Sequence, residues 1–220
     1  MSRTRGDADR RTHRRVLDVA IRQFAANGFK KVTIRAICRE AGANVAAVNY
    51  HFRDKLGLYR QVLEAAVTVM TETTEAARQA TEGLAAEDKL RAYIRVVARR
   101  IFAQGADSWV HQLINREMSD PTPVMSTLVD RGLRPRLELL GGIIAELLDL
   151  PATDERVLLC VSGIHAQVIM LRPSPIGARL QEQFKLRALT PELVADHVAA
   201  FSIAGLTAFA TRRNRRQRHP

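Results

Sequence analysis

Apolar and polar residues recur with the period of an α-helix along nearly the whole chain. A compact example is the stripe formed by Ile34, Ile37 and Ala41. Thr33 precedes this stripe and can cap a helix, because its hydroxyl can accept a bond from an unpaired backbone N–H. Gly42 follows it and can reach positive φ without steric cost, as a tight turn requires. The pattern therefore predicts a short helix over 34–41 that ends in a turn.

A second short helix is predicted directly after this turn. Asn44 is a good N-cap for a helix over 45–51, and Val48 and Phe52 continue the apolar stripe. The positions that face away from the stripe are small or polar: Ala46, Ala47, Asn49 and Tyr50. Two such helices indicate a helix-turn-helix whose second helix enters a DNA major groove. The same arrangement also occurs as a plain structural corner, and this pattern alone leaves both interpretations open.

The rest of the chain has helical patterning and no convincing strand. Helices are predicted at 55–80, 87–103, 108–118, 124–148, 154–171 and 191–212. Prolines break the pattern after 118, bend the helix near Pro135, and start the last helix at Pro191 behind a Thr190 cap. We therefore predict an all-α fold, with a three-helix helix-turn-helix DNA-binding domain over 1–56 and a larger helical domain over 57–220.

Composition limits the classes of function. The chain has 220 residues, 46% of them hydrophobic, which suits one large domain or two small ones. The N-terminus has no apolar signal segment, and no uninterrupted apolar run reaches the roughly 18 residues of a membrane span. Cys38 and Cys160 are far apart on apolar stripes, which predicts buried thiols rather than a disulfide or a metal site. We expect a cytoplasmic protein that does not contact a membrane.

Nothing in the sequence favours catalysis. The six histidines are scattered, and none forms an HExxH or another pair at metal-ligand spacing beside acidic residues. A phosphate loop, a dinucleotide-binding fingerprint and a GxSxG motif are also absent. We therefore expect no enzyme activity, no cofactor and no metal.

Positive charge is concentrated at the two ends of the chain. Residues 1–56 contain 13 Lys and Arg against 5 Asp and Glu, which is a net charge of +8. Residues 212–220 contain five arginines and no acidic residue, which is +5. Because the whole chain has a net charge of +11, residues 57–211 have a net charge of −2. A localised basic patch favours binding to a polyanion. The N-terminal residues 2–15 are expected to be a disordered arm, which either follows the DNA backbone or minor groove or is a solvated tail. The basic segment Arg212–Arg218 is expected to be a nonspecific DNA contact or, more simply, a solubilising tail.

A more specific motif follows the second short helix. It has the form YHF-x-x-K-x-x-LY and consists of Tyr50, His51, Phe52, Lys55, Leu58 and Tyr59. Here the chain resembles the tetracycline-repressor (TetR) family of bacterial transcription regulators. The upstream helix also resembles the first helix of that family's DNA-binding domain, through Ile21, Phe24, Ala25, Asn27, Gly28 and Phe29. The resemblance covers about residues 12–60 and implies binding to double-stranded DNA.

Roles follow for the individual DNA-binding candidates. A carboxamide can form a bidentate pair with adenine, so Asn49 is the best candidate for direct base contact. Ala46 and Ala47 can touch thymine methyl groups, and Asn44 starts the helix that presents them. Backbone-positioning contacts are expected from Thr33, Arg35, Tyr50, His51 and Lys55. The alternative is a basic module that binds DNA or other partners without sequence specificity.

The larger domain has features of a dimer and of a ligand chamber. The last two long helices have more apolar surface than one core can bury. They also contain small residues, which are Ser162 and Gly163 in one helix and Ser202, Ala204, Gly205 and Ala208 in the other. In the TetR resemblance two subunits pair here, and a homodimer fits a palindromic operator. An ordinary buried core is the alternative.

The resemblance also implies a small-molecule effector bound among the middle helices. Candidate lining residues are Phe102, Trp109, His111, Leu113, Met125, His165, Gln167 and Met170. Each polar member can instead be a core side chain with internal hydrogen bonds. Arg116-Glu117-Met118 and Asp120-Pro121-Thr122-Pro123, together with AGANVAAVNYHF, resemble the CecR (formerly CerR) branch of the family. That resemblance implies control of transport or drug-sensitivity genes, and we expect a repressor that a small molecule releases from its operator.

Overall fold

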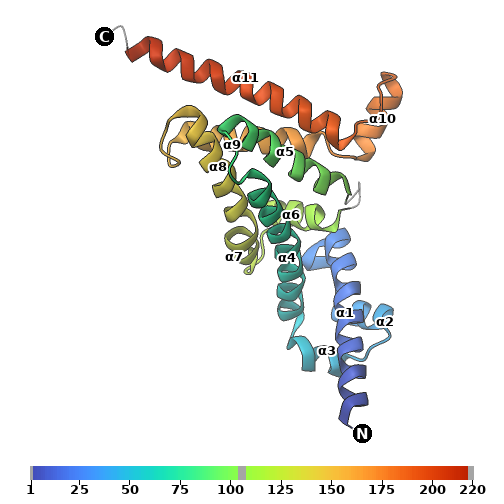
Figure 1. Ribbon diagram of the computed structural model, residues 1–220. Coiled ribbons are helices and arrows are strands. Elements are labelled where there is room, and N and C mark those ends of the chain that lie inside the picture. Colours follow the sequence, from blue (N-terminus) through green and yellow to red (C-terminus); the bar gives the residue numbers. More distant parts are fainter. Residues whose placement is uncertain (1, 104–107, 218–220) are drawn as a thin grey trace. The chain divides into compact units, whose positions relative to one another are not determined.

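The computed structural model describes residues 2–103 and 108–217, and within these ranges the chain is helical without any strand (Figure 1). The contacts between residues divide the chain into two units. The first comprises Met1–Met70 and Ser108–Leu133, and the second comprises Thr71–Asp107 and Arg134–Pro220. Each unit is considered by itself below.

The first unit contains the predicted helix-turn-helix. Its helices are α1 (Ser2–Lys31), α2 (Ile34–Ala41), α3 (Val45–Phe52), the first part of α4 (Lys55–Thr81), α6 (Trp109–Ser119), α7 (Met125–Leu128) and the π-helix η1 (Val129–Leu133). Its core joins residues of α1, α2, α3, α4 and α6, among them Phe24, Ile37, Val48, Leu58 and Leu113. The backbone of α1 leaves helical geometry at Gly28, where φ is 77°. Helix α1 therefore consists of two helical segments joined by a kink at this glycine.

Residues 2–15 form the beginning of α1, which differs from the disordered arm expected from the sequence. Arginine is a good helix former, and an Asp7–Arg10 pair at 2.5 Å lies one turn apart on the helix surface. His13 Nε2 also lies 3.0 Å from Gln61 Oε1 of α4, which ties this part of the helix to the unit. The side chains of Arg3 and Arg5 lie outside the described residues.

The second unit is built from α5 (Ala86–Ala103), α8 (Arg134–Leu148), α9 (Glu155–Met170), α10 (Pro175–Gln183), α11 (Pro191–Gln217) and the end of α4. Its core is mostly aliphatic and draws chiefly on α5, α8, α9 and α11, with Ile94, Leu140, Ile144, Val161 and Val198 among its residues. Thr190 caps α11 as predicted, because its hydroxyl accepts from Leu193 N at 3.2 Å. The side chains of the basic tail, Arg212–Arg218, lie outside the described residues.

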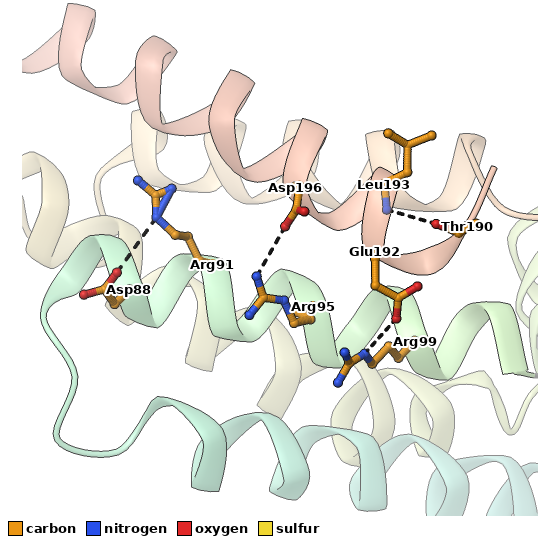
Figure 2. Close-up of polar contacts among 8 residues, drawn as sticks. All are labelled: Asp88, Arg91, Arg95, Arg99, Thr190, Glu192, Leu193 and Asp196. Atoms are coloured by element: carbon orange, nitrogen blue, oxygen red, sulfur yellow. Dashed lines mark hydrogen bonds and ion pairs between the residues drawn. The ribbon is translucent and has the colours of Figure 1, made fainter. Parts of the chain in front are cut away.

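Ion pairs align α11 with α5 along their solvent-facing edges. Figure 2 shows Arg95 paired with Asp196 at 3.3 Å and Arg99 paired with Glu192 at 3.2 Å. Pairs this exposed contribute roughly 0–1 kcal/mol each, so the apolar core fixes the packing and the pairs favour one alignment. By length and composition, Pro191–Phe209 could cross a membrane, and a third of this stretch is buried. Length and composition do not distinguish such a helix from the core helix of a globular domain.

Two segments depart from the predicted helices. The helix expected over 124–148 is divided into α7, η1 and α8, because Pro135 cannot donate its helical hydrogen bond and the π-turn lies directly before it. Gly132 of this turn lies against Met70, and a Cβ there would come within 2.9 Å of the Met70 sulfur. Helix α10 was not predicted at all, although Ser174 caps it and Pro175 occupies its first turn.

Candidate nucleic-acid interface

Both caps predicted for the helix-turn-helix are present. Thr33 Oγ1 accepts from Ala36 N at 3.2 Å, and Asn44 Oδ1 accepts from Ala47 N at 2.7 Å. Gly42 is left-handed, with φ 58° and ψ 40°, and its N–H bonds to the carbonyl of Cys38. These local bonds fix the angle at which α3 leaves α2, because each satisfies a helix-end group that the chain would otherwise expose.

Helix α3 has one buried face and one exposed face. Val48 and Phe52 are buried in the core of the first unit, as predicted. Asn49 and Ala46 are exposed, and 78% of the Tyr50 side chain is accessible to solvent. The exposed face therefore offers a carboxamide, a phenol and a small side chain, which is the chemistry expected of a groove-reading helix. Ala47 is half-buried at the edge of this face.

The side chains that surround α3 differ in availability. Arg35 of α2 is exposed, so its positive charge is available to solvent. His51, in contrast, has only 10% of its side chain accessible, and its Nε2 lies 3.1 Å from Asp9 Oδ1. His13 stacks on Phe52 beside it, with the rings of His13 and His51 5.4 Å apart. The phosphate contact predicted for His51 stays a prediction, and it would require the imidazole to leave Asp9.

Lys55 is also engaged within the protein. Its ammonium lies 4.5 Å from the centre of the Phe29 ring and 3.4 Å from the carbonyl of Lys30. Burial lowers the pKa of this ammonium. The lysine thus attaches the start of α4 to the end of α1, and its contact with DNA stays a prediction.

Helix α6 contributes a second set of contacts to the first unit that the sequence did not reveal. Glu117 is 3% exposed and accepts bonds from the Tyr59 hydroxyl at 2.6 Å and from Thr122 N at 3.0 Å. Its neighbour Arg116 donates to the carbonyl of Ala26 near the end of α1 at 2.5 Å. These bonds explain why the unit is wider than the domain predicted over 1–56. A glutamate on the apolar side of a helix, beside Leu113, was the available signal.

Four of the effector-pocket candidates belong to the first unit. Leu113 is fully buried in its core, and Trp109 is partly buried against that core. The ring nitrogen Nδ1 of His111 lies 2.8 Å from Ser108 Oγ, the cap of its own helix. Met125 is 37% exposed. Their contact with an effector stays a prediction.

The other four candidates belong to the second unit. Phe102 packs partly buried on its core, whereas Met170 is 78% exposed. His165 bonds to Tyr93, with Nε2 and the phenol oxygen 2.8 Å apart. Gln167 donates weakly to the carbonyl of Gly163, at 3.4 Å, and lines a surface groove. Their contact with an effector also stays a prediction.

That groove lies between α9 and α11. Its volume is about 250 Å³, and its lining is mostly apolar: Leu159, Cys160, Gly163, Ile164, Gln167, Phe201, Ser202, Gly205, Leu206 and Phe209. A Cβ at Gly163 or at Gly205 would meet open space, so neither glycine is needed for contacts within this unit. Cys160 is half-buried here rather than fully buried as predicted, whereas Cys38 is buried. Burial raises the pKa of both thiols.

Among the residues that the structure describes, no three His, Cys, Asp or Glu side chains gather as metal ligands would. Helix α3 presents exposed polar groups instead, at Asn49 and Tyr50.

Two family models match the chain. The model described as bacterial regulatory proteins, tetR family, matches residues 16–62. The model described as HTH-type transcriptional dual regulator CecR, C-terminal domain, matches residues 86–206, which is more than half of the chain. The first match covers α2 and α3, and the second covers most of the helices of the second unit.

Two proteins with similar sequences are transcription regulators. The dual regulator CecR of Shigella flexneri is 25% identical over 72% of this chain and 74% of its own length. The regulator AcrR of the same organism is 31% identical over 29% of this chain, a match that spans only 30% of AcrR.

Solved structures with the same fold carry TetR-family descriptions. SCO4454, a TetR-family regulator from Streptomyces coelicolor, has 23% identity and a TM-score of 0.59 over 89% of this chain and 94% of its own. A TetR-family regulator from Mesorhizobium loti MAFF303099 has 18% identity and a TM-score of 0.60 over 91% and 96%. With the capped helix-turn-helix and the two matching domain models, the chain belongs to the TetR family of DNA-binding transcription regulators, with a C-terminal domain of the CecR type.

Proposed function

We propose that the protein is a homodimeric repressor that binds a palindromic operator and leaves it when a small-molecule effector binds. Transport or drug-sensitivity genes are the proposed targets, and the cytoplasm is the proposed compartment. The observation on which the DNA-binding part rests is the exposed face of α3, where Asn49 and Tyr50 are accessible while Val48 and Phe52 hold the helix in the core.

Specific residues support sequence recognition over nonspecific binding. A carboxamide at Asn49 can pair with adenine, and the small Ala46 beside it lets the helix approach the bases closely. Tyr50 of α3 and Arg35 of α2 are both exposed and suit contacts with phosphates. A module that only attracted DNA by charge would need cations alone.

The groove between α9 and α11 supports dimerisation. Leu159, Phe201 and Phe209 are 68%, 65% and 58% exposed around it, which is costly for an isolated subunit. The Ser202 hydroxyl at its base is buried without a hydrogen bond. A second copy related by a two-fold axis would cover this surface and place two α3 helices for a palindrome.

Effector control is supported by the relatives. The structural neighbour SmeT was solved as a complex with triclosan, and it shares 18% identity and a TM-score of 0.58 with this chain. An effector releases DNA only if it binds the released conformation more tightly than the bound one. The protein therefore has to differ in conformation between the two states.

The experiment is a footprint on the DNA that flanks the gene of this protein. A protected palindrome is expected, and fluorescence anisotropy should then show binding to it that is about a thousandfold tighter than to scrambled DNA of the same composition. Tyr50→Ala should weaken binding to both DNAs by similar factors, whereas Asn49→Ala should weaken operator binding selectively. Uniform coating of all DNAs would instead support a nonspecific basic module.

A further inference from the structure

The start of helix α1 contacts the DNA-binding helix α3 through an acidic side chain. Nε2 of His51 lies 3.1 Å from Oδ1 of Asp9, and the two side chains are 10% and 52% accessible to solvent. Because an ionised carboxylate can only accept hydrogen bonds, Nε2 must carry the proton and donate it. The match to the tetR family model begins at residue 16, so Asp9 lies outside the part of the chain that this model covers.

The first turns of α1 are held by surface contacts and not by a core. Residues 9–15 are exposed or half-buried, and Val16 is the first described residue of the helix that is buried. His13 provides a second attachment, since its Nε2 lies 3.0 Å from Oε1 of Gln61 on α4. Because little apolar surface is buried here, these turns can shift at a small cost in free energy.

The Asp9 carboxylate lies at the end of the first unit where DNA contacts are proposed. In Figure 1 the start of α1 extends past α2 and α3 at this end. His51 directly follows Asn49 and Tyr50, whose side chains are exposed on α3. A phosphate that approached Nε2 of His51 would meet the carboxylate that already accepts its proton, and the two anions would repel each other.

We propose that Asp9 occupies on His51 the place of a DNA phosphate, and so competes with DNA for this imidazole. The inference rests on the proposed function, because it takes His51 to contact the DNA backbone. A carboxylate and a phosphate are both anionic acceptors, and either can receive the same Nε2–H. DNA binding therefore exchanges one anion for another at His51, and the start of α1 moves away from α3 in the exchange. Asp9 lowers the affinity for DNA of any sequence, because a phosphate contact carries no sequence information.

A second acidic residue in the same turns of α1 separates this competition from a general effect of charge. Asp7 has the same charge as Asp9, but it pairs with Arg10 at 2.5 Å. Both carboxylates weaken the attraction of this basic segment for DNA at long range. Asp9 adds direct competition for the His51 imidazole, so its removal should have the larger effect.

The test measures DNA affinity of full-length variants by fluorescence anisotropy at one fixed salt concentration. Asp9→Asn should tighten binding to operator and to random DNA alike, by about fivefold, because the competing charge is removed. Asp7→Asn is the matched control and should tighten binding by less than about twofold. Asp9→Glu retains the carboxylate and should bind as the wild type does. In a His51→Gln background, Asp9→Asn should lose its advantage over Asp7→Asn.

Three results would overturn the inference. If Asp9→Asn leaves DNA affinity unchanged or weakens it, the contact only supports α3. Equal gains for Asp9→Asn and Asp7→Asn would reduce the effect to general charge, and a gain that persists in the His51→Gln background would exclude His51 as the group in competition. Asp7 and Asp9 are 60% and 52% accessible, so their variants should fold and decide the question even if His51→Gln does not fold.

The operator footprint separates this inference from the proposed function. The expected Asp9 effects on all DNA, without a protected operator, would support the competition and contradict a sequence-specific repressor. A protected operator whose affinity does not respond to Asp9→Asn would retain the repressor and reject the competition. Absence of DNA binding by the wild type and by every variant would overturn both.

Discussion

The buried bonds between Glu117 and Tyr59 should be a main source of stability in the DNA-binding unit. The Glu117 carboxylate accepts a hydrogen bond from the Tyr59 hydroxyl at 2.6 Å. It also accepts bonds from the backbone amide and the hydroxyl of Thr122, at 3.0 and 3.1 Å. Tyr59 is 0% exposed, so loss of the acceptor leaves its hydroxyl buried without a partner. A buried hydroxyl without a hydrogen-bond partner lowers the free energy of unfolding by about 1–3 kcal/mol. A hydrogen bond to a charged group contributes about 1.5–3 kcal/mol to that free energy.

These magnitudes give a graded series. Glu117→Ala should lower the free energy of unfolding by about 3–5 kcal/mol, because it removes every bond and opens a small cavity. Glu117→Gln keeps one acceptor and should cost about 1–2 kcal/mol, and Tyr59→Phe should cost about 1.5–3 kcal/mol. The double variant that combines Tyr59→Phe with Glu117→Gln should be more stable than the sum of the two single changes predicts, by about 1 kcal/mol.

The assay is urea unfolding followed by circular dichroism at 222 nm, with equal slopes as the condition for comparison. Glu64→Gln is the control within the same unit, because Glu64 pairs with Arg131 at the surface and should change stability by less than about 1 kcal/mol. A loss below about 1 kcal/mol for Glu117→Ala would refute the reasoning. Strict additivity of Tyr59→Phe and Glu117→Gln would show that the two groups do not stabilise one another.

Three further predictions concern other sites. Asn49→Ala should cost about 1–3 kcal/mol of operator affinity, mainly at one base pair, and equal losses on operator and random DNA in anisotropy titrations would contradict its assigned role. Leu159→Glu should convert dimers to monomers in analytical ultracentrifugation, whereas Leu84→Glu, at an exposed leucine outside the groove, should not; a dimeric Leu159→Glu protein would exclude this interface. His165 has a folded pKa of about 4, below its ordinary value, so the unfolded chain takes up a proton first as pH falls and stability decreases. Between pH 7 and pH 5 the free energy of unfolding should fall by about 2 kcal/mol because of His165. This fall should be absent in His165→Gln and unchanged in His197→Gln. Equal pH dependence of unfolding in the wild type and both variants would disprove the prediction.

Local features of the fold were predictable from the sequence because they depend on neighbours three or four residues apart. The caps at Thr33 and Asn44, the turn at Gly42, and the long helices α4, α5, α9 and α11 have the positions that their residues indicate, whereas the helix predicted over 124–148 is divided. Helix α10 was missed although Ser174 and Pro175 repeat the start signal recognised at Thr190 and Pro191. Its apolar residues are exposed, as at Ile176, so no buried stripe accompanied that signal.

By itself, then, the sequence determined an all-helical chain with a capped helix-turn-helix, and through it the family. Only the tertiary structure decided which side chains are available: His51 faces Asp9, and Lys55 lies over Phe29. It alone brought the Tyr93 hydroxyl within 2.8 Å of His165 Nε2. The physical reason is that a helix cap is a bond between residues three apart, whereas these partners are 26 to 72 residues apart and meet only when helices pack.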